Sequence, residues 1–572
     1  MPWNASNLSN LRYGYDFVVA ATQASINSTL LTFMNTRKEP LVNICYIADE
    51  EGDPQRIEYD ELLKLTNSVD PFTIPANSKP ATDPKLAALL AARFMMGFRA
   101  RIGVPGGVRP EDLPDIVALG SDSTGAVEFN LLCSEFTIAS LTPGGGYSTS
   151  PKWMLQSQPR GSPWTFKSHV NLSLSETKAF GTLPTEIQAQ IKNLSGTAFS
   201  VQQLLFDLTN AKLMTTPTIE GVTPGTSLHT QLQQTFISGY FTQLQKEGRP
   251  LLGCAVVPQT EMGATMTLTD MDLLTCPFLD GAGQPIAHPT KEHRDLSTLC
   301  YLCAADGAKL PPLTRFAWNW VEPNEISDHH GVISINRKTL TTYFKNKLDP
   351  YVRTVCFKPE VKLTIDGLEV RPDYGLRADQ TPAITMPETE SLVLRYTYEE
   401  KSADRAGLGG TLARFNLDTK FELTVEFKGT TIIIKQISKI WMYLMATGIS
   451  GEGHIVDKVI TNTYNIGINA KGRLEAVKTS VPEDKGGKDV KVSGLEDLLT
   501  NFNDVSEGIS RYAKSVVATS FKEIPLDPVQ NYIFPGGQTF IFKHVAFSDT
   551  QDLVSFISYA DPTRVFTVPK DA

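Results

Sequence analysis

The sequence predicts an α+β protein in which amphipathic helices cover the faces of long, rolled antiparallel strands. Apolar and polar residues alternate over 456–468, which is the two-residue period of a half-buried strand. Apolar residues recur every three or four positions over 228–244 and 495–517, which is the period of a helix. Strands longer than about five or six residues need twist or curvature to stay packed, and this favours a rolled sheet over a flat sandwich.

Length and composition indicate a soluble globular protein of two or more domains. The chain has 572 residues, 41% hydrophobic and 20% charged. With 53 basic and 62 acidic residues its net charge is −9, which argues against a nucleic-acid partner. The first residues lack the basic and apolar regions of a secretory signal, and the apolar window 86–98 is too short to span a bilayer. We therefore expect a cytoplasmic protein, or one released without a Sec-type signal peptide.

In the first half, strands and helices are expected to follow each other closely. Asp83 and Pro84 form a start signal for a helix that reaches Phe98. Strands are expected at 13–19, 41–47, 127–138, 164–174 and 251–257, and helices at 25–34, 85–98, 185–192, 201–213 and 228–244.

The stretch 316–353 opens the second half. Trp318 and Trp320 are expected on a short strand, and a polar loop with His329 and His330 leads into a strand at 332–336. A helix then runs over 340–351, with Asn336 or Ser334 as its cap and Pro350 at its end or at a kink. The triplet Ser-Ile-Asn occurs here and at 25–27, each time followed by a leucine four residues after the Asn. Coincidence is one interpretation; the other is that each half begins with an aromatic strand that leads into a helix.

After this stretch the pattern is dominated by strands. They are expected at 421–427, 430–434, 456–468, 532–534, 539–547 and 553–559. Ser493 and Glu496 form a capping box for a helix over 495–517, whose apolar stripe must cover a large sheet face.

The motifs of common enzymes and metal sites are missing or incomplete. No nucleophile elbow, zinc-protease helix, Walker loop or kinase set occurs, and the glycine runs at 143–146, 407–410 and 535–537 are typical of hairpin tips. The acidic turn 49–54 lacks the spacing of a calcium loop. Two weaker candidates are left. Cys300 and Cys303 could bind zinc with His288 and His293, or be core thiols, and His329 with His330 could serve acid–base or metal chemistry, or be structural.

Four segments resemble the clostridial P47 family. They are 13–19, 241–253, the group formed by 318–320, 330–333 and 343–344, and the ending 535–553 with Pro535-Gly536-Gly537 and Ser548-Asp549. That family accompanies some botulinum-type neurotoxin gene clusters beside the OrfX proteins. The resemblance implies tandem tubular lipid-binding (TULIP) domains, in which long amphipathic helices are wrapped by highly curved antiparallel sheets. It carries no catalytic residues, no metal and no cofactor.

On this basis we expect a noncatalytic lipid-interacting protein that is an accessory to virulence. The expected partners are lipid or another hydrophobic ligand, and other toxin-complex proteins. The expected domains are 1–312, with insertions, and 313–572, with strands exchanged between them. An acyl chain would lie between helix and sheet, where the groove candidates are Leu232, Phe236, Tyr240, Leu340, Phe344, Leu498, Phe502 and Ile509. The alternative is a structural or protein-interaction scaffold whose grooves are filled, because apolar stripes are usually core.

Overall fold

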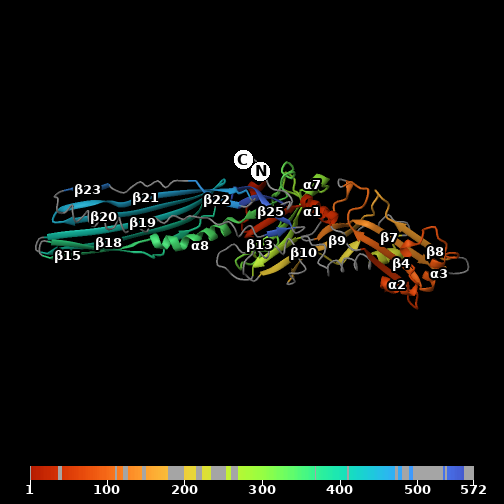
Figure 1. Ribbon diagram of the computed structural model, residues 1–572. Coiled ribbons are helices and arrows are strands. Elements are labelled where there is room, and N and C mark those ends of the chain that lie inside the picture. Colours follow the sequence, from red (N-terminus) through yellow and green to blue (C-terminus); the bar gives the residue numbers. More distant parts are fainter. Residues whose placement is uncertain are drawn as a thin grey trace.

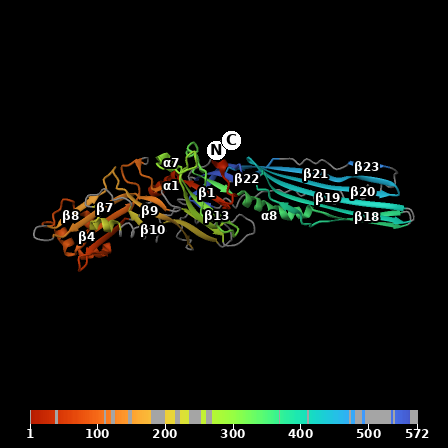
Figure 2. The same cartoon turned by 180° about the vertical axis from the view of Figure 1, so that it is seen from behind.

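The structure consists mainly of antiparallel β-sheets, and the second half of the chain contributes the longest strands. The computed structural model describes residues 2–36, 41–109, 112–119, 126–144, 150–177, 199–213, 222–233, 253–258, 268–366, 369–388, 390–408, 411–470, 474–479, 489–493, 532–534 and 538–559. Three larger sheets follow one another along an elongated molecule (Figures 1 and 2). All the strand pairs within them are antiparallel.

The seven-stranded sheet at one end contains the longest strands. Its order is β17 (Ala383–Thr385), β18 (Leu392–Leu408), β19 (Thr411–Lys428), β20 (Thr431–Ala446), β21 (Ile449–Ile468) and β22 (Leu474–Lys478), with β23 (Asp489–Ser493) paired to β21. Even-numbered residues of β20 are buried and most odd-numbered ones are partly exposed, so one face of the sheet is covered. The alternation expected over 456–468 is confirmed within β21.

The central sheet joins segments from both ends of the chain. Its order is β12 (Leu268–Cys276), β13 (Thr298–Ala305), β1 (Phe17–Thr22), β14 (Gly331–Ile335), β26 (Leu553–Tyr559), β25 (Gln538–Phe547), β24 (Tyr532–Phe534), β11 (Gly253–Pro258), β10 (Phe199–Leu213), β9 (Phe166–Thr177), β6 (Ala126–Leu131) and β5 (Val117–Ala118). The expected division near residue 312 stays a prediction, and β1 pairs with β14 from beyond it.

A five-stranded sheet and a hairpin complete the described strands. The sheet has the order β3 (Pro54–Ile57), β2 (Val42–Ala48), β4 (Phe94–Ile102), β7 (Cys133–Thr142) and β8 (Lys152–Ser157), and the hairpin pairs β15 (Lys358–Asp366) with β16 (Glu369–Arg377). The helices are α1 (Gln23–Thr36), α2 (Tyr59–Leu65), α3 (Pro84–Ala91), α5 (Ser227–Gln231), α7 (Lys291–Asp295) and α8 (Arg337–Val355), with 3-10 turns η1 (Pro2–Ala5) and η2 (Pro71–Thr73).

The predicted fold class, long helices wrapped by highly curved sheets, is wrong. The described part of the chain is mostly β, with 26 strands against six α-helices in several antiparallel sheets. The longest of these helices, the 19-residue α8, lies against one side of the seven-stranded sheet (Figure 1). The physical reason is that hairpins joining neighbouring long strands satisfy the backbone within the sheet, so helices are needed only as local covers.

Two expected helices are strands, wholly or in part. The segment predicted as a helix over 201–213 belongs to β10, because its apolar residues also fit a sheet that is bonded to β9 and β11. The helix predicted over 85–98 ends at Ala91, where Arg93 turns the chain with a positive φ of 55° and β4 begins at Phe94. The strand expected around Trp318 is absent from this fully described segment, which forms bends and turns.

Other expected elements are confirmed or lie outside the described residues. Asn336 caps α8 as predicted, since its side chain accepts a hydrogen bond from the Lys338 amide at 2.8 Å. The helix expected over 228–244 is described only as α5 and the residues up to 233. The helices expected over 185–192 and 495–517 lie outside the described residues.

Candidate functional site

The first turn of α8 is fixed to the central sheet by three polar side chains. Asp552 Oδ1 accepts the Arg337 amide at 2.9 Å, and Asn336 Nδ2 donates to the Tyr15 carbonyl at 2.8 Å. Asp16 Oδ1 accepts the Thr339 hydroxyl at 2.5 Å. Carboxylates at this end also favour the partial positive charge of the helix N-terminus. The start of α8 is therefore held in place by segments that are hundreds of residues apart in sequence.

Asp552 is the centre of this anchor. It is fully buried, and besides Arg337 it accepts the Leu8 amide at 2.6 Å and the Ser6 hydroxyl at 3.0 Å. Burial raises the pKa of the Asp552 carboxyl to about 6, against the lowering effect of these donors. The carboxylate thus joins the first residues of the chain, α8 and β26 at one point.

The apolar side of α8 packs on the covered face of the seven-stranded sheet. We call this contact the α8 seam; its helix side is formed by Leu340, Tyr343, Phe344, Leu348, Val352 and Val355, all buried. Phe344 meets Phe427 of β19 with ring centroids 5.6 Å apart. At the Leu340 and Phe344 end the seam is filled by side chains, which leaves these residues 0% and 1% exposed.

The groove candidates are only partly described. Leu232, Leu340 and Phe344 are buried members of one apolar cluster, which also contains the sheet residues Phe421 and Ile432. Phe236, Tyr240, Leu498, Phe502 and Ile509 lie outside the described residues. The assignment of these eight side chains to a lipid groove stays a prediction.

Two tyrosine hydroxyls connect α8 to the sheet within this apolar contact. Tyr396 of β18 donates to Asp349 Oδ1 at 2.6 Å, and Tyr351 of α8 donates to Gln436 Oε1 at 2.6 Å. Burial raises the pKa of Tyr351 to about 12, and burial together with the Asp349 carboxylate raises that of Tyr396 well above its ordinary value. Both phenols therefore stay protonated and act as donors at neutral pH.

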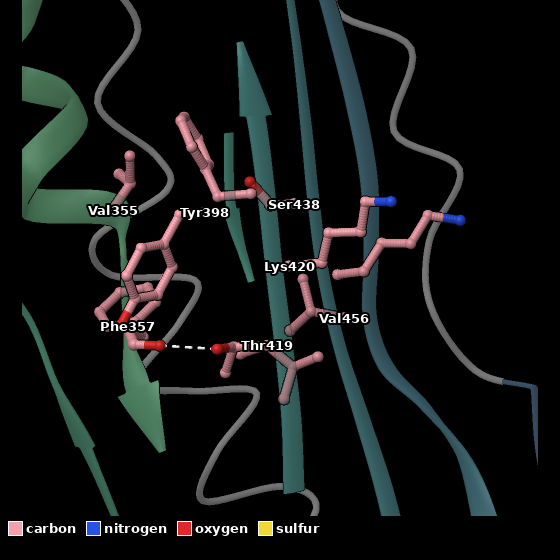
Figure 3. A pocket seen from close by; sticks show the side chains of 10 residues that line it. Val355, Phe357, Tyr398, Thr419, Lys420, Ser438 and Val456 are labelled. Carbon is pink, nitrogen blue, oxygen red and sulfur yellow. Dashed lines mark hydrogen bonds between the residues drawn. The ribbon is translucent and has the colours of Figure 1, made fainter. Parts of the chain in front are cut away.

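The seam is incompletely filled where α8 ends. A pocket, here called the α8 pocket, lies between the end of the helix and the sheet, with Val355, Phe357 and Tyr398 opposite Thr419, Ser438 and Val456 (Figure 3). The Thr419 hydroxyl donates to the Phe357 carbonyl at 2.6 Å, and the Lys420 ammonium points away from the helix (Figure 3). The space open to a water molecule is about 10 Å³, room for about one water.

The α8 pocket marks the border between two covers of the same sheet face. On one side of the pocket, α8 covers Phe421 to Phe427 of β19. On the other side, the β15–β16 hairpin covers Phe415 and Leu417, and Leu363 of β15 belongs to the same apolar cluster. Sequence reasoning missed this pocket because it depends on which strand residues lie opposite the end of the helix, and the register is set only by the folded sheet.

The histidine loop is packed against β26. His329 stacks on Phe556 with centroids 4.2 Å apart, and His330 Nδ1 lies 3.3 Å from the Ser558 hydroxyl. Burial lowers the pKa of both imidazoles. Whether this loop has acid–base function stays a prediction.

Cys300 and Cys303 are buried on β13, as expected for core thiols. Because they are three positions apart on a strand, they face opposite sides: Cys300 joins the cluster around Trp320 and Cys303 the cluster around Phe17. They therefore cannot ligate one metal together. No group of three or more His, Cys, Asp or Glu is placed to hold a metal ion in the part of the chain that the structure describes.

Membrane crossing by a helix finds no support among the described residues, where no helix combines the necessary length and hydropathy. The chain matches no protein-family model and no curated protein. Its structure is similar to the crystal structure of P47 of Clostridium botulinum E1, with a TM-score of 0.41 and 10% identity over 95% of this chain and 98% of that one. For the crystal structure of a lipopolysaccharide binding protein the TM-score is 0.23 and the identity 9%, over 96% and 99%. Scores this low carry no argument about function, and TULIP membership and toxin partners stay predictions.

Proposed function

We propose that the protein is a noncatalytic binding protein for an apolar ligand of the lipid class, taken up at the C-terminal end of the α8 seam. The observation that carries the proposal is the α8 pocket, an apolar space next to helical turns that contain a proline. In its present size the pocket excludes an acyl chain, so uptake requires the end of α8 to move away from the sheet.

Pro350 lowers the free-energy cost of such a movement. It lies inside α8 and has no amide hydrogen, so the Asn346 carbonyl one turn earlier loses its usual helical partner. Beyond Pro350 the helix is bonded to its surroundings through the Tyr351 hydroxyl and the Arg353 carbonyl, which accepts the Asp379 amide. The first turn has more such bonds, made by Asn336, Thr339 and both the amide and the guanidinium of Arg337. The helix can therefore open at its end while its start stays fixed.

An acyl chain would replace contacts that already exist in the seam. The apolar side chains that line the α8 pocket, including Phe357, Ile440 and Val456, are buried. Covering them with a hydrocarbon chain gains about 25 cal/mol per Å² of apolar surface, the same as covering them with the helix. Uptake therefore requires that the chain buries more surface than the displaced turn does, by enough to offset the Tyr351–Gln436 hydrogen bond that the movement breaks. In this proposal Leu340 and Phe344 form the closed end of the groove.

Bound lipid is the first test. Protein purified without detergent from several expression hosts is extracted with organic solvent, and the extract is profiled by mass spectrometry. We expect acyl lipid in stoichiometric amount. Extracts free of lipid from every host, together with no saturable binding of a fluorescent sixteen-carbon fatty acid, would overturn the proposal.

A matched pair of variants tests the position. Val355→Phe fills the α8 pocket and should weaken binding of the fluorescent fatty acid by about tenfold or more, since overpacking such a site blocks a ligand. Val477→Phe, on β22 and 51% exposed, makes the same change away from the pocket and should leave the affinity unchanged. Equal affinity for both variants would place any lipid site elsewhere.

A second candidate function is favoured by the filled end of the seam. Leu340 and Phe344 have no room beside them, which is what a structural or protein-interaction scaffold with filled grooves requires. Under this alternative the purified protein carries no lipid and captures one defined protein partner from its native host.

A further inference from the structure

A second and larger pocket lies beside α7. We call it the α7 pocket. The segment that follows β12, helix α7 and the ends of β5 and β6 surround it, and its volume is about 430 Å³. In Figure 1, α7 lies next to α1 in the middle of the molecule. A space of this size is in the range of small-molecule sites.

One wall of the α7 pocket is apolar. Phe278, Pro285, Ile286 and Leu119 contribute to it, and the Phe278 ring is half-buried. The rigid prolines and the buried Leu119 give this wall a fixed shape. Such a surface accommodates a short hydrocarbon group.

The lining also includes an arginine, Arg315, that has no counter-charge among the described residues. Arg315 Nε is enclosed from solvent and has no hydrogen-bond partner within the described structure. An enclosed guanidinium donor normally pairs with a carboxylate, a phosphate or a carbonyl, because its desolvation is costly otherwise. Arg315 therefore presents an unused donor at the edge of a cavity.

The other charged groups at the α7 pocket have partners. Glu128 pairs with Lys167 at 2.5 Å, so its negative charge is balanced. Arg294 donates to the Pro289 carbonyl at 3.0 Å and lies 3.6 Å from Asp115. Asp115 is in turn paired with Lys291 at 3.1 Å. The positive charge of Arg315 is thus the one that stays unbalanced among the described lining residues.

His293 adds a second donor. Its Nδ1 accepts the Thr290 amide at 3.3 Å, so the neutral ring carries its hydrogen on Nε2. The ring stacks on Phe278, with centroids 5.8 Å apart and planes 10° apart, which fixes its orientation. Ser297 cannot serve an incoming ligand as easily, because its hydroxyl already accepts from Phe278 N and donates to the His293 carbonyl.

We propose that the α7 pocket binds an amphipathic oxyanion, a phosphate monoester or a carboxylate on a short hydrocarbon stem. The oxyanion accepts hydrogen bonds from the Arg315 guanidinium and from His293 Nε2, and the stem lies on Phe278 and Ile286. This site is separate from the α8 pocket and does not depend on the function proposed there.

Calorimetric titration of the full chain with octyl phosphate, octanoate and inorganic phosphate tests the proposal. We expect saturable binding of octyl phosphate, at least about tenfold tighter than that of inorganic phosphate because the stem is buried. Arg315→Gln should weaken the binding of octyl phosphate at least about tenfold. Arg315→Lys should weaken it less, since lysine keeps the positive charge but loses the bidentate geometry of the guanidinium. Arg371→Gln, on the exposed hairpin, is the control and should change nothing.

Vesicles identify the source of the anion. Co-sedimentation with phosphatidylcholine vesicles containing phosphatidic acid, lost in Arg315→Gln, assigns a lipid headgroup; octyl phosphate binding without vesicle binding assigns a free amphiphile. Absence of saturable binding of every probe, an unchanged affinity in Arg315→Gln with an unchanged melting temperature, or equal affinity for inorganic and octyl phosphate would overturn the proposal.

Discussion

The two ends of α8 differ in how they are held, although one apolar stripe runs through both. The start is fixed by Asp552 and Asp16, which reach it from segments distant in sequence, and by its own cap Asn336, which donates to the Tyr15 carbonyl. The end follows Pro350 and borders the α8 pocket. The difference teaches that one helix can combine a buried polar anchor with an apolar end that borders a pocket. In our proposal only that end opens.

The largest expected effect comes from the strands beneath the anchored end. In Gly331→Ala the new Cβ would lie 2.2 Å from the Ala20 carbonyl oxygen across the β1–β14 pair. Backbone on both sides leaves no room to adjust, so we expect a loss of about 5 kcal/mol or more in the free energy of unfolding. Chemical denaturation measures it. A stable Gly331→Ala protein would mean that β1 and β14 do not approach so closely.

Asp552→Ala removes the anchor itself. The Leu8 amide, the Ser6 hydroxyl and the Arg337 amide would lose a buried acceptor. Unsatisfied buried donors of this kind cost about 4 kcal/mol together. Urea unfolding checks the loss, and Asp366→Ala, on the exposed hairpin, is the control. A cost of under about 1 kcal/mol would show that the start of α8 does not depend on this carboxylate.

The pKa of Asp552 predicts a pH dependence of stability. Its folded-state value of about 6 lies above the ordinary 3.8, so the protonated form is favoured in the folded protein. Its stabilising contribution is complete below pH 3.8 and is lost as pH rises through about 6, a decrease of about 3 kcal/mol. The measurement is the difference in unfolding free energy between wild type and Asp552→Asn from pH 4 to 7. A difference that is constant over this range, or that moves in the opposite direction, would contradict the assignment.

The smallest effect is expected at the C-terminal end of α8. Pro350→Ala restores an amide donor to α8 and should stabilise the protein by about 1 kcal/mol. If the end must open, the same change should weaken the uptake of a fluorescent fatty acid. Thermal unfolding and fluorescence titration together check it. Greater stability with unchanged uptake would separate the helix end from ligand binding.

Local patterns in the sequence predicted individual elements well where one period dominated. The strict alternation over 456–468 identified β21, and Asn336 was recognised as the cap of α8. Where both the helical and the strand period fitted the sequence, the neighbouring strands in the sheet determined which structure formed. Residues 201–213 carry apolar side chains at helical spacing, but they lie between β9 and β11 in the sheet. Helical periodicity alone therefore overestimated the helical content and gave the wrong fold class.

The sites could not be predicted because they depend on groups brought together by folding. Arg315 belongs to no recognisable motif. The ligand-binding role that we propose for it depends on folding, which brings its loop close to β5 and β6, two strands distant in sequence. His293 was considered as a zinc ligand, whereas in the structure it caps α7 and stacks on Phe278. The α8 pocket similarly depends on the register of β19, β20 and β21 against the end of the helix.

Hydrogen exchange along α8, with and without a sixteen-carbon fatty acid, tests the central claim most directly. The proposed opening predicts that the amides of residues 351–356 exchange much faster than those of 341–348 in the free protein, and that the fatty acid slows the exchange of the former group. Equal protection at both ends of the helix, unaffected by the fatty acid, would contradict it.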